Sequence, residues 1–142
     1  PDGEIFTAPE ENSTQGHIKF TYPAIYGGRE VSGVYLEFKE GKIVKATATK
    51  NEAFLKEMIA TDEGSHKLGE LGIGLNPSLV KPIKSILFDE KMFGTIHLAI
   101  GSAYEECLGV NKSAVHWDFI KDMRDGKIFL DGKIVYENGG FL

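Results

Sequence analysis

The chain has 142 residues, with 16 basic and 21 acidic side chains and a formal net charge of -5 at pH 7. This length suits a single domain around one core. The acidic balance argues against a nucleic-acid or anionic-membrane partner held by a basic face, and it leaves carboxylates available for a cation site. No apolar run approaches the ~20 residues of a membrane span, and the N-terminus has no signal-peptide pattern.

Cys107 is the single cysteine, so it has no partner for an internal disulfide. A reducing compartment is the simpler interpretation, and we expect a soluble cytoplasmic protein. The chain begins at Pro1 in PDGE, a turn signal typical of connections between elements. We therefore expect the C-terminal portion of a longer polypeptide, with a short extended segment at residues 5–7.

The next part of the chain predicts a strand and a hairpin. Residues 17–22 alternate apolar and polar side chains, which is typical of a half-buried strand. Residues 31–39 and 42–49 flank Glu40-Gly41, which favours two strands joined by a tight turn.

A helix is predicted after this hairpin. Phe54, Leu55, Met58 and Ile59 form an apolar stripe at helical spacing, and Asn51 is placed to cap the helix. These large apolar side chains favour a core position rather than a cofactor surface.

Residues 62–76 are rich in glycine and contain one embedded carboxylate, Glu70. This pattern predicts a bulged or tightly packed strand whose backbone comes close to another group. The segment lacks the GxGxxG and P-loop patterns of a phosphate site. Pro77 and Pro82 then indicate a loop or a short irregular helix.

Residues 95–100 (TIHLAI) predict a strand, because they are β-branched and apolar and lie between two glycines. Alternate side chains on a strand share a face, so His97 should point away from Ile96 and Leu98. A lone histidine on a strand is usually structural, but Glu90 and Tyr104 lie nearby in the chain.

The last third predicts a short helix at residues 102–108 and a strand at 113–120, on which His116 and Asp118 share a face. Asp131-Gly132, between two short apolar segments, is the strongest two-residue hairpin signal in the chain. Together these elements predict one α+β domain over residues 1–142, with a mixed or antiparallel sheet, hairpins and two or three short helices.

Carboxylates, imidazoles and a phenol could together form a metal site. Mixed nitrogen and oxygen ligands suit Zn²⁺, Co²⁺ or Mn²⁺, and more than four of them imply two ions. In such a site the ions lie ~3.5–4 Å apart, activate a shared water and polarise a carbonyl. The candidates are scattered along the chain, so a binding module without chemistry stays open; they are Glu4, Glu70, Glu90, His97, Tyr104, His116 and Asp118.

Four ordered blocks, PDGEIFTAP, LGELGIGLNP, FDEKMFGTIHLAIGSAY and HWD, resemble the C-terminal domain of the thermophilic-type metalloaminopeptidases. That family includes aminopeptidase T, aminopeptidase S and PepS, and the resemblance extends from Pro1 to about Asn138. It implies a dinuclear metalloexopeptidase that removes N-terminal residues from peptides through a metal-bridging hydroxide. It also implies Zn²⁺ or Co²⁺, with Mn²⁺ or Mg²⁺ as further candidates, a homodimer, and an N-terminal domain that this chain lacks.

The resemblance assigns roles to individual residues. Glu70 would bridge the ions, Glu4 or Glu70 would shuttle a proton, and Tyr104 would be a ligand or a donor to the oxyanion. The link between Glu90 and His97 is longer than is usual in the family. The implied metal ligands are Glu4, Glu70, Glu90, His97, His116 and Asp118.

Two alternatives remain for the function. The chain could be a non-catalytic β-rich binding or oligomerisation domain in which these side chains are structural. It could also be a metal-dependent amidohydrolase acting on another substrate, because fold and ligands alone do not choose the scissile bond.

Overall fold

The computed structural model describes residues 1–142, and its central element is a four-stranded sheet in the order β1-β7-β8-β9. All neighbouring strands in this sheet are antiparallel. Because β1 comes from the N-terminus and the other strands from the second half of the chain, the sheet joins distant segments. The strands are β1 (Glu4–Thr7), β7 (Leu68–Gly74), β8 (Thr95–Gly101) and β9 (His116–Asp122).

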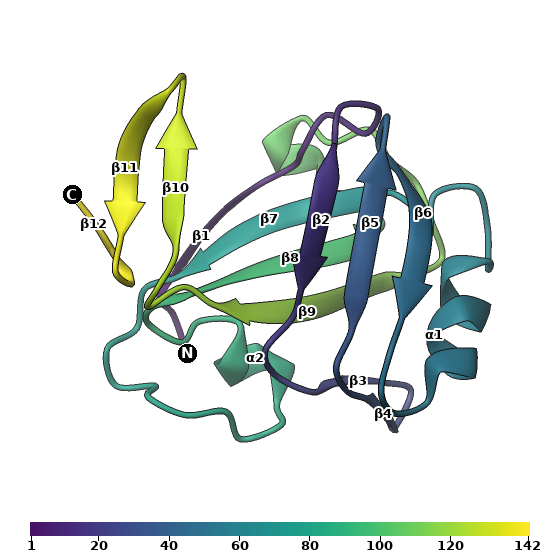
Figure 1. Cartoon of the computed structure of the whole chain (residues 1–142), viewed down its shortest axis with the longest axis horizontal. Coiled ribbons are helices and arrows are strands. Elements are labelled where there is room, and N and C mark those ends of the chain that lie inside the picture. The colour runs from purple at the N-terminus through teal and green to yellow at the C-terminus, as the bar shows by residue number, and fades with distance from the viewer.

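A second antiparallel sheet lies over one face of the first and crosses its strand direction (Figure 1). It contains β2 (Gly16–Lys19), β5 (Tyr35–Lys39) and β6 (Lys42–Thr47) in the order β2-β5-β6, and α1 (Glu52–Ile59) lies beside β6.

The hydrophobic core fills the space between these two sheets. Leu36 of β5 and Trp117 and Phe119 of β9 are buried there, and Leu55 of α1 closes one side. Burial of large apolar side chains from both layers is the main term that holds the sheets together.

Smaller elements surround this sandwich. A two-stranded ribbon forms from β3 (Ala24–Tyr26) and β4 (Arg29–Val31). A loop of prolines and lysines precedes the short helix α2 (Ile86–Asp89), and a 3-10 turn occupies Glu105–Cys107.

The C-terminal segment forms a separate three-stranded sheet of β10 (Lys127–Leu130), β11 (Lys133–Glu137) and β12 (Gly140–Phe141). Figure 1 shows it standing to one side of the sandwich. No helix has the length and apolar character that crossing a membrane requires.

The predicted α+β class is confirmed, and the sheets are antiparallel. Both predicted hairpins form, because Glu40 and Gly41 (φ 51° and 83°) and Asp131 and Gly132 (φ 49° and 78°) adopt the left-handed backbone of tight turns. The glycine-rich segment is a strand with a bulge between Leu68 and Glu70, as predicted.

Two local predictions were wrong. Asn51 does not cap α1 through its side chain, because its Nδ2 instead donates to the Glu30 carbonyl oxygen at 2.7 Å. Residues 102–108 form only a 3-10 turn at Glu105–Cys107, because the backbone is extended at Tyr104 (φ -83°, ψ 133°) and left-handed at Leu108 (φ 59°).

Candidate metal centre

The candidate ligands lie on one face of the four-stranded sheet and at its margin. Glu70 of β7 is opposite Ala99 of β8, which is opposite Asp118 of β9, so the two carboxylates share a row with a small side chain between them. His97 is two residues from Ala99 and therefore faces the same side. Glu4 opens β1 at the edge of the sheet, and Glu90 follows α2 directly.

One set of donor atoms comes from Glu4, Glu90 and His97, whose ligand atoms all lie within 4.8 Å of one another. His97 is fully buried, and its Nε2 lies 3.1 Å from Glu4 Oε2. Glu90 and His97 are close in the chain, whereas Glu4 is distant from both, and only the tertiary structure places it beside the imidazole.

The second set comes from Glu70, His116 and Asp118, again within 4.8 Å of one another. His116 Nε2 lies 3.2 Å from Glu70 Oε2 and 3.5 Å from Asp118 Oδ2. His116 Nδ1 donates to the Ser102 carbonyl oxygen at 2.8 Å, which leaves Nε2 directed at the carboxylates. Histidine ligands of metals usually have such a partner on the other ring nitrogen.

Glu70 connects the two sets. Its Oε1 lies 3.3 Å from His97 Nε2, and its Oε2 lies 3.2 Å from His116 Nε2. One oxygen therefore faces each set, which is the arrangement a carboxylate needs to bridge two ions. Glu70 is only 4% exposed, so this geometry is enclosed by protein.

The donor set fits divalent cations that accept oxygen and nitrogen. Glu4 Oε2 and Asp118 Oδ1 are buried without a hydrogen-bond partner. Buried polar atoms are normally satisfied, so these two oxygens have capacity for a ligand. His97 Nδ1 is also buried without a partner.

The charges in the cluster change the pKa of its members. Burial opposes a charge on His97, but Glu4 and Glu70 outweigh it and raise its pKa to about 10. The hydrogen bond to Glu70 raises the pKa of His116 to about 9. Burial alone would raise the pKa of Glu70, but the two histidines lower it to about 2. Burial raises the pKa of Asp118 to about 6.

Tyr104 lies at the rim of the cluster and belongs to neither donor set. Its ring centre is 5.1 Å from that of His116 and 5.5 Å from that of Phe6, and the residue is 42% exposed. Burial, and after it the charge of Glu70, raises the pKa of its phenol. The phenol is therefore kept neutral and able to donate a hydrogen bond at neutral pH.

Lys91 is a member of this cluster that sequence reasoning missed. It is 6% exposed, and its Nζ lies 3.2 Å from Glu4 Oε1, contacts Glu90 Oε1 and donates to the Leu87 carbonyl oxygen at 3.0 Å. The only signal in the sequence was its position next to Glu90. Because lysine is rarely buried unless it is paired, the sequence alone favours a surface position for it.

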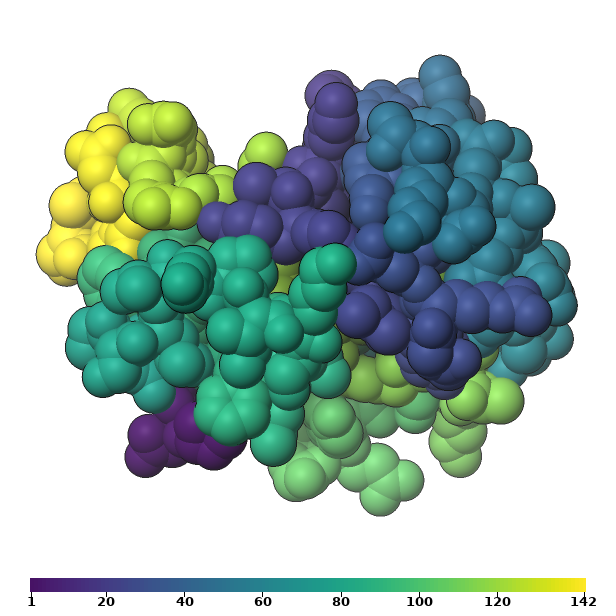
Figure 2. All heavy atoms as spheres, turned by 90° about the horizontal axis from the view of Figure 1, so that it is seen from below, coloured from purple at the N-terminus to yellow at the C-terminus, as the bar shows by residue number.

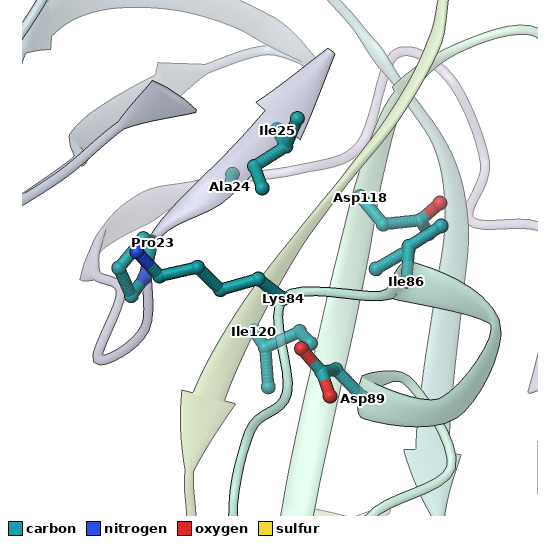
Figure 3. A pocket seen from close by; sticks show the side chains of 8 residues that line it. All are labelled: Pro23, Ala24, Ile25, Lys84, Ile86, Asp89, Asp118 and Ile120. Atoms are coloured by element: carbon teal, nitrogen blue, oxygen red, sulfur yellow. The ribbon is translucent and has the colours of Figure 1, made fainter. Parts of the chain in front are cut away.

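A cavity of about 200 Å³ adjoins the second donor set and is shown in Figure 3. It lies between the β3 segment, α2 with its preceding loop, and β9. In Figure 2 the teal residues of the α2 segment border the blue residues of the β3 and β4 segment. The lining combines apolar side chains with carboxylates; it consists of Pro23, Ala24, Ile25, Lys84, Ile86, Asp89, Asp118 and Ile120.

The sequence model of the family described as "Thermophilic metalloprotease (M29)" matches residues 1–141 of the chain. The chain belongs to this M29 family. Aminopeptidase AmpS of Bacillus subtilis (strain 168) is 37% identical over 163 aligned positions, which cover 99% of the chain and 40% of that relative. Aminopeptidase T of Thermus thermophilus is 32% identical, covering 98% of the chain and 36% of that relative.

Solved structures also resemble this M29 chain. Wild-type AmpT from Thermus thermophilus superposes with a TM-score of 0.86 at 29% identity, covering 98% of the chain and 39% of that structure. A 2,5-dihydroxypyridine dioxygenase from Pseudomonas putida KT2440 superposes with a TM-score of 0.73 at 23% identity, which shows a shared fold alone. The chain thus spans about 40% of the length of the relatives it matches.

Proposed function

We propose that the chain is the metal-binding C-terminal domain of a longer dinuclear metalloaminopeptidase, which hydrolyses N-terminal residues from peptides. The position of Glu70 carries this proposal, because its two oxygens face His97 and His116 at 3.3 and 3.2 Å. Membership of a metalloprotease family, with relatives that are named aminopeptidases, supports the reaction class.

The two donor sets would hold one divalent cation each. Glu4, Glu90 and His97 would bind the first ion, His116 and Asp118 would bind the second, and Glu70 would bridge them. Zn²⁺ and Co²⁺ suit this mixture of carboxylate and imidazole, with Mn²⁺ and Mg²⁺ as further candidates. When bound, such a pair supplies an activated water, in effect a bridging hydroxide, and polarises the scissile carbonyl.

The chain's own residues would perform the remaining steps. Glu4 or Glu70 would accept a proton and pass it to the departing amine. The phenol of Tyr104, at the rim beside His116, would donate a hydrogen bond to the developing oxyanion. Neutral Tyr104 is required for this role, which agrees with the raised pKa of its phenol.

The cavity beside Asp118 would receive the side chain of the substrate's first residue. Its volume of about 200 Å³ exceeds the ~150 Å³ of apolar cavities that accommodate a benzene ring. The carboxylate of Asp118 links this cavity to the second donor set, so an occupant would have its backbone near the candidate ions (Figure 3). We further propose that the complete protein acts as a homodimer.

Metal content and metal-dependent stability test the proposal. The chain, purified without chelator, should bind two equivalents of Zn²⁺ or Co²⁺, and its melting temperature should rise with added metal. Metal-dependent hydrolysis of aminoacyl chromogenic amides should then appear in a polypeptide of the relatives' full length that carries this chain.

The alternatives predict different results. A non-catalytic binding domain would melt at the same temperature before and after exhaustive chelation. An amidohydrolase with another substrate would bind both ions but would cleave acylated amines or simple amides in preference to aminoacyl amides. Either result would refute the aminopeptidase proposal, and the second would leave the metal centre intact.

A further inference from the structure

We propose that Lys91 is a positioning residue that weakens cation binding at the set of Glu4, Glu90 and His97. The set of Glu70, His116 and Asp118 would therefore fill first. This inference rests on the proposed function, because it assumes that both sets bind cations. Beyond that function, Lys91 would be a residue outside both donor sets that determines the order in which the two cation sites fill.

The lysine is held at a defined position. An ammonium group has three donors, and Lys91 Nζ has three acceptors around it: the Leu87 carbonyl oxygen at 3.0 Å, Glu4 Oε1 at 3.2 Å and Glu90 Oε1. The residue is 6% exposed, so water does not compete effectively for these contacts. Lys91 is therefore a fixed part of the cluster rather than a mobile surface charge.

These contacts determine which carboxylate oxygens remain available. Lys91 takes Oε1 of both glutamates, while the Oε2 of Glu4 is buried without a hydrogen bond, 3.1 Å from His97 Nε2. Each glutamate can then offer one oxygen to a cation while the other stays on the lysine. Removing Lys91 would free both oxygens and allow either glutamate to bind a cation through two.

The lysine also makes the two sets unequal in charge. Glu4 and Glu90 contribute two negative charges, of which Lys91 offsets one. Glu70 and Asp118 also contribute two, but the structure records no ion pair between either of them and a lysine or arginine. At the effective dielectric of partly buried sites, one adjacent unit charge changes the affinity for a cation by at least about tenfold.

Calorimetric titration of the metal-free chain with Zn²⁺ tests the inference. The unmodified chain should show two binding steps that differ by at least about tenfold in affinity. Lys91→Met removes the charge at similar length, and it should tighten the weaker step by at least about tenfold while leaving the tighter step within about threefold. Lys91→Arg keeps the charge and should retain two unequal steps.

A matched control is available on the surface. Lys127 forms an ion pair with Glu137 on the separate C-terminal sheet and its side chain is 50% exposed, so Lys127→Met should leave both steps unchanged. If Lys91 had a purely structural role, Lys91→Met would lower the melting temperature and change both binding steps together. Lys91→Arg would then not selectively keep the weaker step at its original affinity.

Glu90→Gln in the otherwise unmodified chain identifies the weaker set without relying on the folding of Lys91→Met. It should abolish the weaker step and preserve the tighter one, and loss of the tighter step would overturn the inference. Unchanged or weakened binding in Lys91→Met would overturn it as well, while two ions still bound would preserve the proposed function. No binding by the unmodified chain would instead overturn both.

Discussion

Gly72 and His97 face each other across the β7–β8 ladder, and the imidazole occupies the space above the glycine. A Cβ built on Gly72 would lie 2.0 Å from His97 Nε2, closer than any real contact. Glycine is therefore required at position 72, because the absence of a side chain leaves room for the buried His97 ring to point at Glu4 and Glu70.

Gly72→Ala should displace the His97 ring and disrupt the first donor set. We expect zinc binding to fall from two equivalents to one, with unfolding easier by about 1–3 kcal/mol because of overpacking. Elemental analysis and denaturant unfolding would measure both effects. Gly140→Ala is the control, since a Cβ there meets only Phe93 at 3.8 Å. Two equivalents bound by Gly72→Ala would show that His97 is dispensable.

Glu70→Gln should affect both donor sets, because each histidine loses a charged partner. We expect less than one equivalent of tightly bound zinc and a loss of about 3–5 kcal/mol in the free energy of unfolding of the metal-free chain, as for other broken buried ion pairs. Metal analysis and urea unfolding give the two numbers. The exposed Glu63→Gln should change neither. Full metal content in Glu70→Gln would remove Glu70 from the bridging role.

Cation binding should release protons at neutral pH. In the metal-free chain the pKa values of His97 and His116 are raised to about 10 and about 9, so both rings are protonated at pH 7. Ligation requires neutral imidazole. Each ion should therefore displace about one proton, and apparent affinity should rise about tenfold per pH unit from about pH 7 to about pH 8.5.

Titration calorimetry in buffers of different ionisation enthalpy would count these protons. The release should disappear as the pH rises through about 9 to 10, where the rings are already neutral. A pH-independent affinity between pH 7 and 8.5 would mean that the histidines do not bind the ions.

Tyr104→Phe removes the phenol while keeping the ring that packs on His116 and Phe6. In a full-length polypeptide carrying this chain, kcat for aminoacyl amides should fall about 10²–10³-fold, as for loss of an oxyanion donor. Metal content should stay at two equivalents, which separates this role from ligation. Tyr35→Phe, on the second sheet, should leave kcat unchanged. Loss of one ion from Tyr104→Phe would make the tyrosine a ligand instead.

Ile86→Trp should fill much of the cavity beside Asp118. In the same full-length context, kcat/KM for substrates that begin with leucine or phenylalanine should fall at least about tenfold, the scale of pocket discrimination between side chains. Activity on alanine substrates should be affected far less. Val80→Trp, in the exposed loop before α2, is the matched control. An equal loss on all substrates would place the first side chain elsewhere.

Local sequence signals determined several parts of this protein. Glu40-Gly41 and Asp131-Gly132 form tight turns because their backbone conformations depend on the residues themselves. His116 and Asp118 share a face because two residues is the period of a strand. The glycine-rich segment also indicated close packing, which Gly72 explains.

Only the tertiary structure decided how the candidate centre is assembled. Glu4 comes from the first strand and reaches His97 because β1 pairs with β7 and β7 with β8. Glu90 lies at the end of the short helix α2, in the segment that leads into β8. Lys91 is buried against Glu4 and Glu90. The predicted helix at 102–108 is limited to a 3-10 turn by the extended backbone of Tyr104 and the left-handed backbone of Leu108. Pairings between distant segments are set by packing of the whole chain, so no local pattern could report them.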